Sequence, residues 1–293
     1  MNFEIDVNSN QYKLLRFLRP GRYFTYNMGI LFGLGLISFL WLYPFLWSVF
    51  SAFKSQREMW GAGARLLPEQ WVWDNIPRAW ETANFSTYFL NTVLYSVSAT
   101  VIVLIASAMC GYVLARYRFF GRNIIYAVVL GTLFVPIATV IIPQFQLVKA
   151  LGLLNTRVGV ILALSGGGAL YVLLFTSFFS TIPEDLYDAA KIDGAGFYQQ
   201  FRLSLPLAKP IIATVIIFQF MQTWNEFNIP LVFTFGRTEL RNLAVGMYAF
   251  QGEHSMDWTG FAAGTVISII PVLLVFFLFQ GYFVRGLQGA VKQ

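Results

Sequence analysis

Long apolar stretches alternate with short polar stretches along the chain, and this pattern predicts membrane-spanning helices. A stretch of about 20 apolar residues crosses a hydrocarbon core about 30 Å thick when it is helical. The stretches of this kind are residues 27–50, 88–115, 124–142, 159–179, 211–233 and 261–284. The pattern therefore predicts an all-α membrane protein, with six transmembrane helices over residues 27–293 and a polar, basic segment over residues 1–26.

Composition supports a membrane protein and excludes several other classes. The chain of 293 residues is 57% hydrophobic and 12% charged, whereas soluble domains carry about 25% charged residues. One cysteine and one histidine exclude an internal disulfide and a zinc site built from these two residue types. We find no catalytic constellation and no metal-ligand cluster in the sequence. The net charge of +6 comes from residues that flank the apolar stretches, so we expect no nucleic-acid partner.

The distribution of basic residues predicts the orientation in the membrane. Cytoplasmic loops of membrane proteins carry an excess of lysine and arginine. This excess lies on the inner side when both termini are placed in the cytoplasm, and it is clearest in the turn 116–122, which has three arginines and no acid. Segment 1–26 suits either a helix lying on an anionic leaflet or a topology signal without stable structure. Residues 181–210 then form a cytoplasmic loop.

The 181–210 loop carries signals for a short helix. Thr181 is a suitable cap, and Glu184, three residues on, is placed to reach back to the cap amide. Leu186, Ala189 and Ala190 are spaced to share one helix face, and Gly194 suits a left-handed stop. We interpret the loop as a helix that docks into the groove of a partner. The alternative is an ordinary linker between two spans.

The same loop resembles the EAA loop of the inner-membrane permease subunits of binding-protein-dependent ABC importers, above all the MalG-like carbohydrate permeases. The likeness rests on Asp188-Ala189-Ala190, then Gly194, then Leu205-Pro206. Asp188 stands where the motif has glutamate, and the stretch after Gly194 is about one residue shorter. Further likenesses, which extend the match over most of residues 85–293, are Trp224-Asn225-Glu226-Phe227, Leu243-Ala244-Val245-Gly246-Met247 and the ending Phe283 to Lys292.

The resemblance implies a type I ABC importer transmembrane domain in the bacterial plasma (inner) membrane, which is not itself an enzyme. It implies four partners besides lipid: a second permease subunit in a heterodimer, two ATPase subunits, and an external solute-binding protein that meets the outer loops 51–87 and 234–260. ATP and magnesium would be bound by the ATPase, and this chain would hold no cofactor. The residues that the resemblance assigns to ATPase coupling are Asp188, Ala189, Ala190, Asp193, Gly194, Leu205 and Pro206.

Glu226 is the only acid inside an apolar stretch, and such residues usually face a bundle interior or a water-filled cavity. It marks a candidate wall of the solute pathway, where Trp224 or Phe227 would stack on a sugar and Asn225 would bind hydroxyl groups. The alternatives are a structural hydrogen bond at a helix break before Pro230 and a contact with a partner subunit.

The expected solute is an oligosaccharide, either maltose-like or acidic as alginate fragments are. An ABC permease for another solute is one alternative. A gradient-driven secondary transporter is a second, although the spans show no internal repeat. A membrane enzyme or scaffold is the third.

Glycine and proline mark irregular places within the predicted spans. Ser165-Gly166-Gly167-Gly168 lacks the lysine of a phosphate-binding loop, and we interpret it as a site of close helix packing. Pro136, Pro230 and Pro271 indicate kinks or broken helices, although Pro136 and Pro271 are equally compatible with packing features.

Overall fold

The computed structural model describes residues 22–61, 65–252 and 255–291. Most of the basic segment 1–26 lies outside these residues, so its expected interfacial position stays a prediction. Within the described residues the regular structure is helical, apart from an isolated bridge between Gln251 and Met256. The all-α expectation is confirmed for this part of the chain.

Three uninterrupted helices in the described part are long and apolar enough to cross a membrane, and two bent helix pairs also qualify. The uninterrupted helices are α2 (Arg22–Ser51), α5 (Phe85–Arg116) and α15 (Trp258–Val291). The bent pairs are α8 (Arg157–Leu164) with α9 (Ala169–Ser180), at 52°, and α11 (Phe197–Ser204) with α12 (Lys209–Trp224), at 79°. The described residues thus offer three to five candidate spans, and the number six and the cytoplasmic termini stay predictions.

The third expected span, residues 124–142, is not a continuous helix. It divides into α6 (Arg122–Thr132) and α7 (Ile137–Ala150), separated at Pro136. Proline has no N–H to donate, and it forces the preceding residue out of the helical region. Pro136 itself has an extended backbone, with ψ of 130°. The break is of the kind that Pro136 indicates in the sequence.

Two more expected spans are broken. Gly167 has φ of +91°, a conformation that favours glycine, and it lies in the break between α8 and α9. A Cβ at Gly168 would lie 3.2 Å from Cγ1 of Val103, so the glycine run serves close packing as expected and also breaks the span. The span 211–233 divides into α12 and α13 (Asn228–Phe233). By contrast, α15 continues through Pro271.

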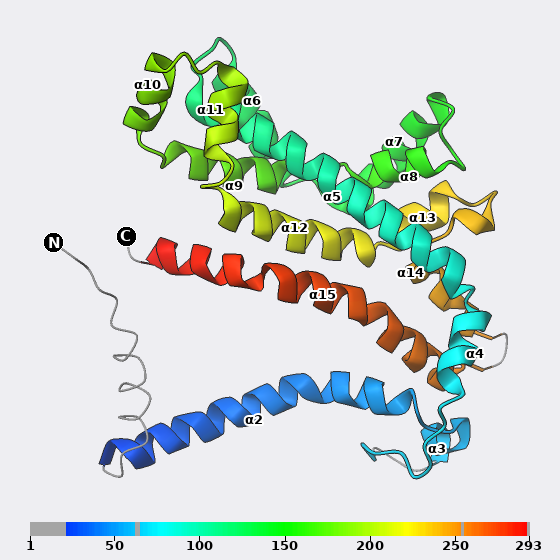
Figure 1. The fold of residues 1–293 in the computed structure, drawn as a ribbon. Coiled ribbons are helices and arrows are strands. Elements are labelled where there is room, and N and C mark those ends of the chain that lie inside the picture. The colour runs from blue at the N-terminus through cyan, green and yellow to red at the C-terminus, as the bar shows by residue number, and fades with distance from the viewer. Residues whose placement is uncertain (1–21, 62–64, 253–254, 292–293) are drawn as a thin grey trace.

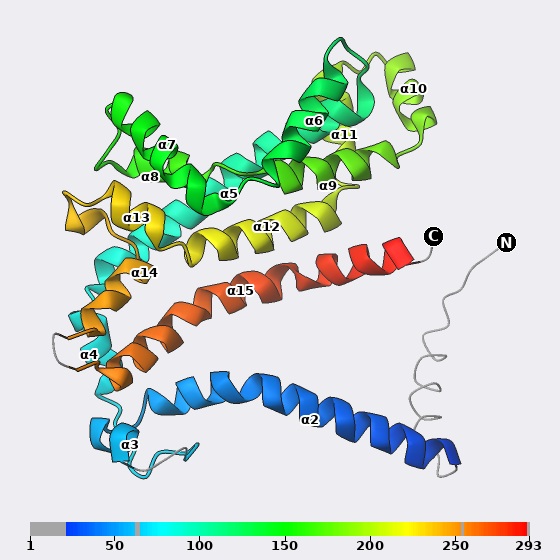
Figure 2. The same cartoon turned by 180° about the vertical axis from the view of Figure 1, so that it is seen from behind.

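The helices α5, α12, α15 and α2 follow one another across the molecule (Figures 1 and 2). Small residues allow close approach along α5, because a Cβ at Gly111 would lie 2.5 Å from Cβ of Phe175 in α9. The helices α10 (Glu184–Ile192) and α11 lie at one end of the molecule, and α3 (Gln56–Gly61) and α4 (Asn75–Thr82) lie at the other. The short elements η1 (Thr238–Leu240), α14 (Leu243–Gly246) and η2 (Met247–Phe250) connect α13 to α15.

Candidate functional site

The helix expected in the 181–210 loop is α10, and it ends at Gly194 as the sequence predicts. Gly194 has φ of +79°. Its N–H donates to the carbonyl of Lys191 at 3.0 Å, and the N–H of Ala195 donates to the carbonyl of Ala190 at 2.8 Å. These two bonds form the Schellman motif, in which a left-handed residue closes the helix.

The start of α10 differs from the expected capping box. Pro183 occupies the cap position and makes no side-chain cap bond. The hydroxyl of Thr181 instead donates to the carbonyl of Phe178 at the end of α9, at 2.7 Å. Glu184 is held by Arg116 at 3.1 Å, so its carboxylate does not reach back to the cap amide. The expectation was wrong because Thr181 bonds backward to the end of α9 and Glu184 pairs with Arg116 of a distant helix.

Arg116, the last residue of α5, holds the start of this loop. Its side chain is 11% exposed, and its guanidinium carbon lies 3.8 Å from the ring centroid of Tyr187. The same guanidinium donates to the carbonyl of Ile182 at 3.3 Å and pairs with Glu184. A desolvated cation over an aromatic ring is stabilised by about 2 kcal/mol. Three groups of the loop thus share one cation of the membrane domain.

Tyr187 also ties α10 to α11. Its hydroxyl lies 2.8 Å from the hydroxyl of Ser204, and both residues are buried. The ring of Tyr112 in α5 packs against Phe197 and Phe201 of α11, with centroid distances of 5.6 and 5.2 Å. The two loop helices therefore rest on the end of α5 as a packed unit.

The opposite face of α10 is exposed. Asp188, Ala189 and Asp193 are exposed and Ala190 is partly exposed, while Asp188 pairs with Lys191 at 2.9 Å. The hydrogen bond from Lys191 to Asp188 raises the pKa of the lysine. The position of Leu186 differs from expectation, because it packs against the core near Tyr187 and not on the outward face.

The last two residues assigned to coupling lie apart from α10. Leu205 and Pro206 stand in the turn between α11 and α12, directly after Ser204. Leu205 is partly buried and Pro206 is exposed. The structure therefore brings them to the base of the loop and not to its outward face.

Trp224 ends α12 in a buried position. Its side chain is 3% exposed, its indole N–H donates to the carbonyl of Ser268 at 3.0 Å, and its ring stacks on Phe220 at 5.3 Å. A ring buried in this way has no free face on which a solute could stack in this structure. Asn225, the next residue, is exposed, and its side-chain amide donates to the carbonyl of Met221 at 2.8 Å.

Glu226 caps the short helix α13. Its carboxylate accepts the N–H groups of Asn228 and Ile229 at 2.9 and 3.2 Å, and its carbonyl accepts from the side chain of Asn242 at 2.7 Å. This arrangement corresponds to the structural hydrogen bond at a helix break, one of the alternatives that the sequence left open. Its role in a solute pathway stays a prediction.

Phe227 has a neighbour that sequence reasoning missed. Tyr248 stacks on it with ring centroids 4.9 Å apart and an interplanar angle of 20°, and Tyr248 is 59% exposed. No spacing or motif in the sequence pairs these two residues. The sequence also contained no sign that Arg116 contacts Tyr187, since the basic turn 116–122 indicated only the orientation in the membrane.

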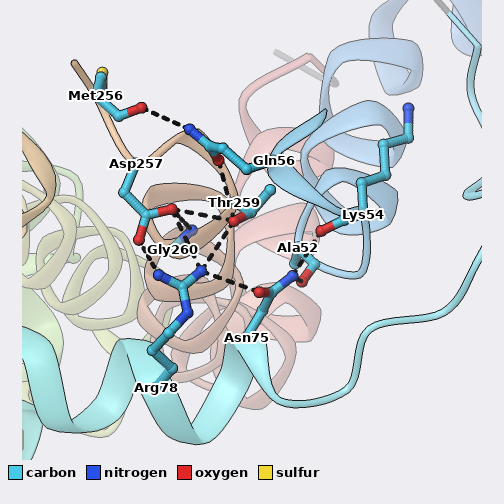
Figure 3. Close-up of polar contacts among 9 residues, drawn as sticks. All are labelled: Ala52, Lys54, Gln56, Asn75, Arg78, Met256, Asp257, Thr259 and Gly260. Carbon is cyan, nitrogen blue, oxygen red and sulfur yellow. Dashed lines mark hydrogen bonds and ion pairs between the residues drawn. The ribbon is translucent and has the colours of Figure 1, made fainter. Parts of the chain in front are cut away.

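A polar cluster joins three elements (Figure 3), at the end of the molecule far from α10 (Figure 1). Arg78 of α4 pairs with Asp257 and donates to Thr259 at 2.9 Å. The side-chain amide of Asn75 donates to the carbonyls of Ala52 and Lys54, at 2.9 and 2.8 Å. The cluster ties the start of α15 to α4 and to the end of α2, within the expected outer loops 51–87 and 234–260.

The electrostatics of this cluster centre on Asp257. Burial alone would raise the pKa of its carboxyl group. Hydrogen bonds from the Arg78 guanidinium, the Gly260 N–H and the Thr259 hydroxyl outweigh burial, so the pKa lies below its ordinary value. Among the residues that the structure describes, no group of three His, Cys, Asp or Glu could hold a metal ion.

The chain has relatives among known proteins. Residues 104–289 match the family model described as "Binding-protein-dependent transport system inner membrane component". The chain is 38% identical over 261 residues to the diacetylchitobiose uptake system permease protein NgcG of Streptomyces coelicolor, with 88% of this chain and 85% of that protein covered. It is 33% identical over 265 residues to the arabinooligosaccharides transport system permease protein AraQ of Halalkalibacterium halodurans, with 89% and 94% covered.

A solved structure has a similar fold. It belongs to a bacterial ABC transporter involved in the import of the acidic polysaccharide alginate, and the TM-score is 0.77. The match covers 90% of this chain and 99% of that chain at 24% identity. At this identity the likeness concerns the fold alone.

Proposed function

Because the chain belongs to the inner-membrane components of binding-protein-dependent transport systems, we propose that it forms half of the pore of an ATP-driven oligosaccharide importer. Its partners would be a second, different permease chain, two cytoplasmic ATPase subunits and an external solute-binding protein. ATP and Mg²⁺ would be bound by the ATPase subunits, and this chain would catalyse no reaction.

The division of α10 into two faces is the observation that carries the coupling role. One face is held by Arg116 and Ser204 through Tyr187. The other presents Ala189 to the surroundings, and Ile192 is 87% exposed. A partner groove that covered these apolar groups would gain about 25 cal/mol for each Å² buried. The EAA resemblance assigns the same face to the ATPase.

The contacts also suggest how motion would pass into the membrane. A displacement of α10 would carry α5 with it through Arg116, and α12 through Ser204 and the turn at Leu205-Pro206. ATP shifts the equilibrium between inward- and outward-open states only as far as the ATPase contacts the two states differently. The docked face of α10 would supply this difference in an alternating-access cycle.

The exposed groups at the break between α12 and α13 favour an uncharged oligosaccharide over an acidic one. Asn225 and Asn228 are exposed and offer amide groups to hydroxyls, and Tyr248 offers an aromatic ring. The carboxylate of Glu226 lies among them and would repel a uronic acid. The named relatives, whose printed substrates are diacetylchitobiose and arabinooligosaccharides, support this substrate class.

The test is a tagged purification from a mild detergent, followed by mass spectrometry of the proteins retained and by solute uptake in proteoliposomes. Ala189→Phe should abolish ATPase retention and ATP-dependent uptake. The matched control is Ala150→Phe, which enlarges an exposed alanine at the end of α7, far from α10 (Figure 1).

Two results would contradict the proposal. A chain that purifies without an ATPase and moves solute along an ion gradient would support a secondary transporter instead. For the substrate class, the binding protein that copurifies with the complex should bind neutral oligosaccharides in preference to alginate fragments, and the reverse preference would count against our choice.

A further inference from the structure

The turn between α5 and α6 carries two arginines that have no assigned role above beyond orientation in the membrane. Arg118 is exposed, and it makes no ion pair or hydrogen bond with any described residue. Arg122 donates its Nε–H to the carbonyl of Leu114 at 2.7 Å, and its two terminal nitrogens have no partner in the described part of the chain. Two guanidinium groups are therefore available to an anion.

Both arginines line one recess of about 390 Å³. The other lining residues are Phe119, Gly121, Asn123 and Ile124, so the recess holds no carboxylate. Guanidinium groups bind phosphate oxygens with paired hydrogen bonds. An anionic group of phosphate type would thus be attracted to the recess, and a zwitterionic group would find no carboxylate for its cation.

The surroundings of the recess are apolar. Phe120 at the tip of the turn is fully exposed, at 101%, and Ile124 is 66% exposed. No residue of α6 is buried, and the candidate span of α5 ends at Arg116. A cationic recess with an apolar rim at the end of a span has the polarity profile of a lipid headgroup beside its acyl chains.

We propose that this recess binds the phosphate headgroup of an anionic glycerophospholipid, whose acyl chains lie along the exposed surface of α6. The lipid sits next to the coupling loop, since Tyr117 of the same turn packs against Phe197 of α11 with ring centroids 5.7 Å apart. The site depends neither on the solute nor on the ATPase.

The experiment titrates the purified complex with phosphatidylglycerol or phosphatidylcholine and counts the bound lipids by native mass spectrometry. The wild-type complex should retain phosphatidylglycerol preferentially. Arg118→Gln should weaken its retention about fivefold without affecting the fold. The matched control is Arg202→Gln, which removes an equal charge from an exposed position on α11 and should leave retention unchanged.

A second arm separates lipid from a soluble anion. Phe120→Ser should weaken phosphatidylglycerol retention, and soluble glycerol phosphate should not displace the lipid at equal concentration. Displacement by glycerol phosphate, equal losses in the Arg118 and Arg202 variants, or no preference between the two lipids would each overturn the proposal. If the Arg118→Gln complex lost the ATPase subunits but retained lipid unchanged, the proposal would also be overturned, and Arg118 would instead contact a protein.

Discussion

The guanidinium of Arg116 lies over the ring of Tyr187, 3.8 Å from its centroid. Arg116 ends a membrane helix and Tyr187 lies in the middle of α10, so this contact joins the membrane domain to the coupling loop. Both side chains are largely withdrawn from solvent. The contact is therefore stronger than an exposed ion pair, which contributes at most about 1 kcal/mol.

Removing the cation should loosen the loop. Arg116→Gln loses a cation–π contact of about 1–2 kcal/mol, which corresponds to a five- to thirtyfold higher population of an opened loop. Trypsin should then cleave faster at Lys191, which lies in this loop. Arg118→Gln, which removes an arginine without a described partner, should leave the cleavage rate unchanged. Equal rates in the Arg116 variant and the wild type would contradict the anchoring role.

The left-handed stop at Gly194 should tolerate asparagine but not valine. A Cβ there meets no atom within 4 Å, so the cost of valine comes from φ of +79° and amounts to about 1–2 kcal/mol. Gly194→Val should weaken copurification of the ATPase while the spans stay folded, as thermal unfolding would show. Gly194→Asn should retain the ATPase, because asparagine enters this conformation readily. Loss of the ATPase from both variants would argue against a backbone effect.

For the uptake of a neutral oligosaccharide, Glu226 should matter as a hydrogen-bond acceptor and not through its charge. Glu226→Gln keeps an acceptor for the N–H groups of Asn228 and Ile229, so uptake and thermal stability should stay near wild type. Glu226→Ala leaves both N–H groups without their cap and should cost about 1 kcal/mol, measured by thermal unfolding in detergent. Strongly reduced uptake of a neutral oligosaccharide in Glu226→Gln with unchanged stability would contradict this prediction.

The cluster around Asp257 should make stability depend on pH. Since the folded pKa of Asp257 is depressed, its contribution is present above the unfolded pKa of about 4 and is lost as the pH falls through the lower folded value. The thermal unfolding temperature of the wild type should fall as the pH is lowered over this range. In Arg78→Ala the dependence should be smaller, because the carboxylate has lost its main partner.

Arg65→Ala is the control for the Asp257 prediction. The Arg65–Glu69 pair is more than half exposed on both sides and should contribute little. This variant should follow the wild-type profile. An unchanged pH profile in Arg78→Ala would show that the ion pair does not couple α4 to α15.

Local sequence determined the features that depend on a residue and its immediate neighbours. Apolar length predicted the presence of α2, α5 and α15 but not all of their ends, because an uninterrupted run of apolar side chains is stable only as a helix in lipid. Gly194 was identified as a helix stop for a similarly local reason, since glycine alone enters the left-handed region without steric cost. The EAA resemblance located the loop that contains it.

The tertiary structure decided which distant groups meet. Arg116 reaches Tyr187 and Glu184 only because α5 and α9 pack side by side, and this contact engages the glutamate expected to reach back to the cap amide. Packing also buried Trp224, which was expected to lie beside the solute, and exposed Tyr248, which the sequence had not singled out. Spacing along a chain determines which residues share a helix face, but the partner of that face depends on how the helices pack.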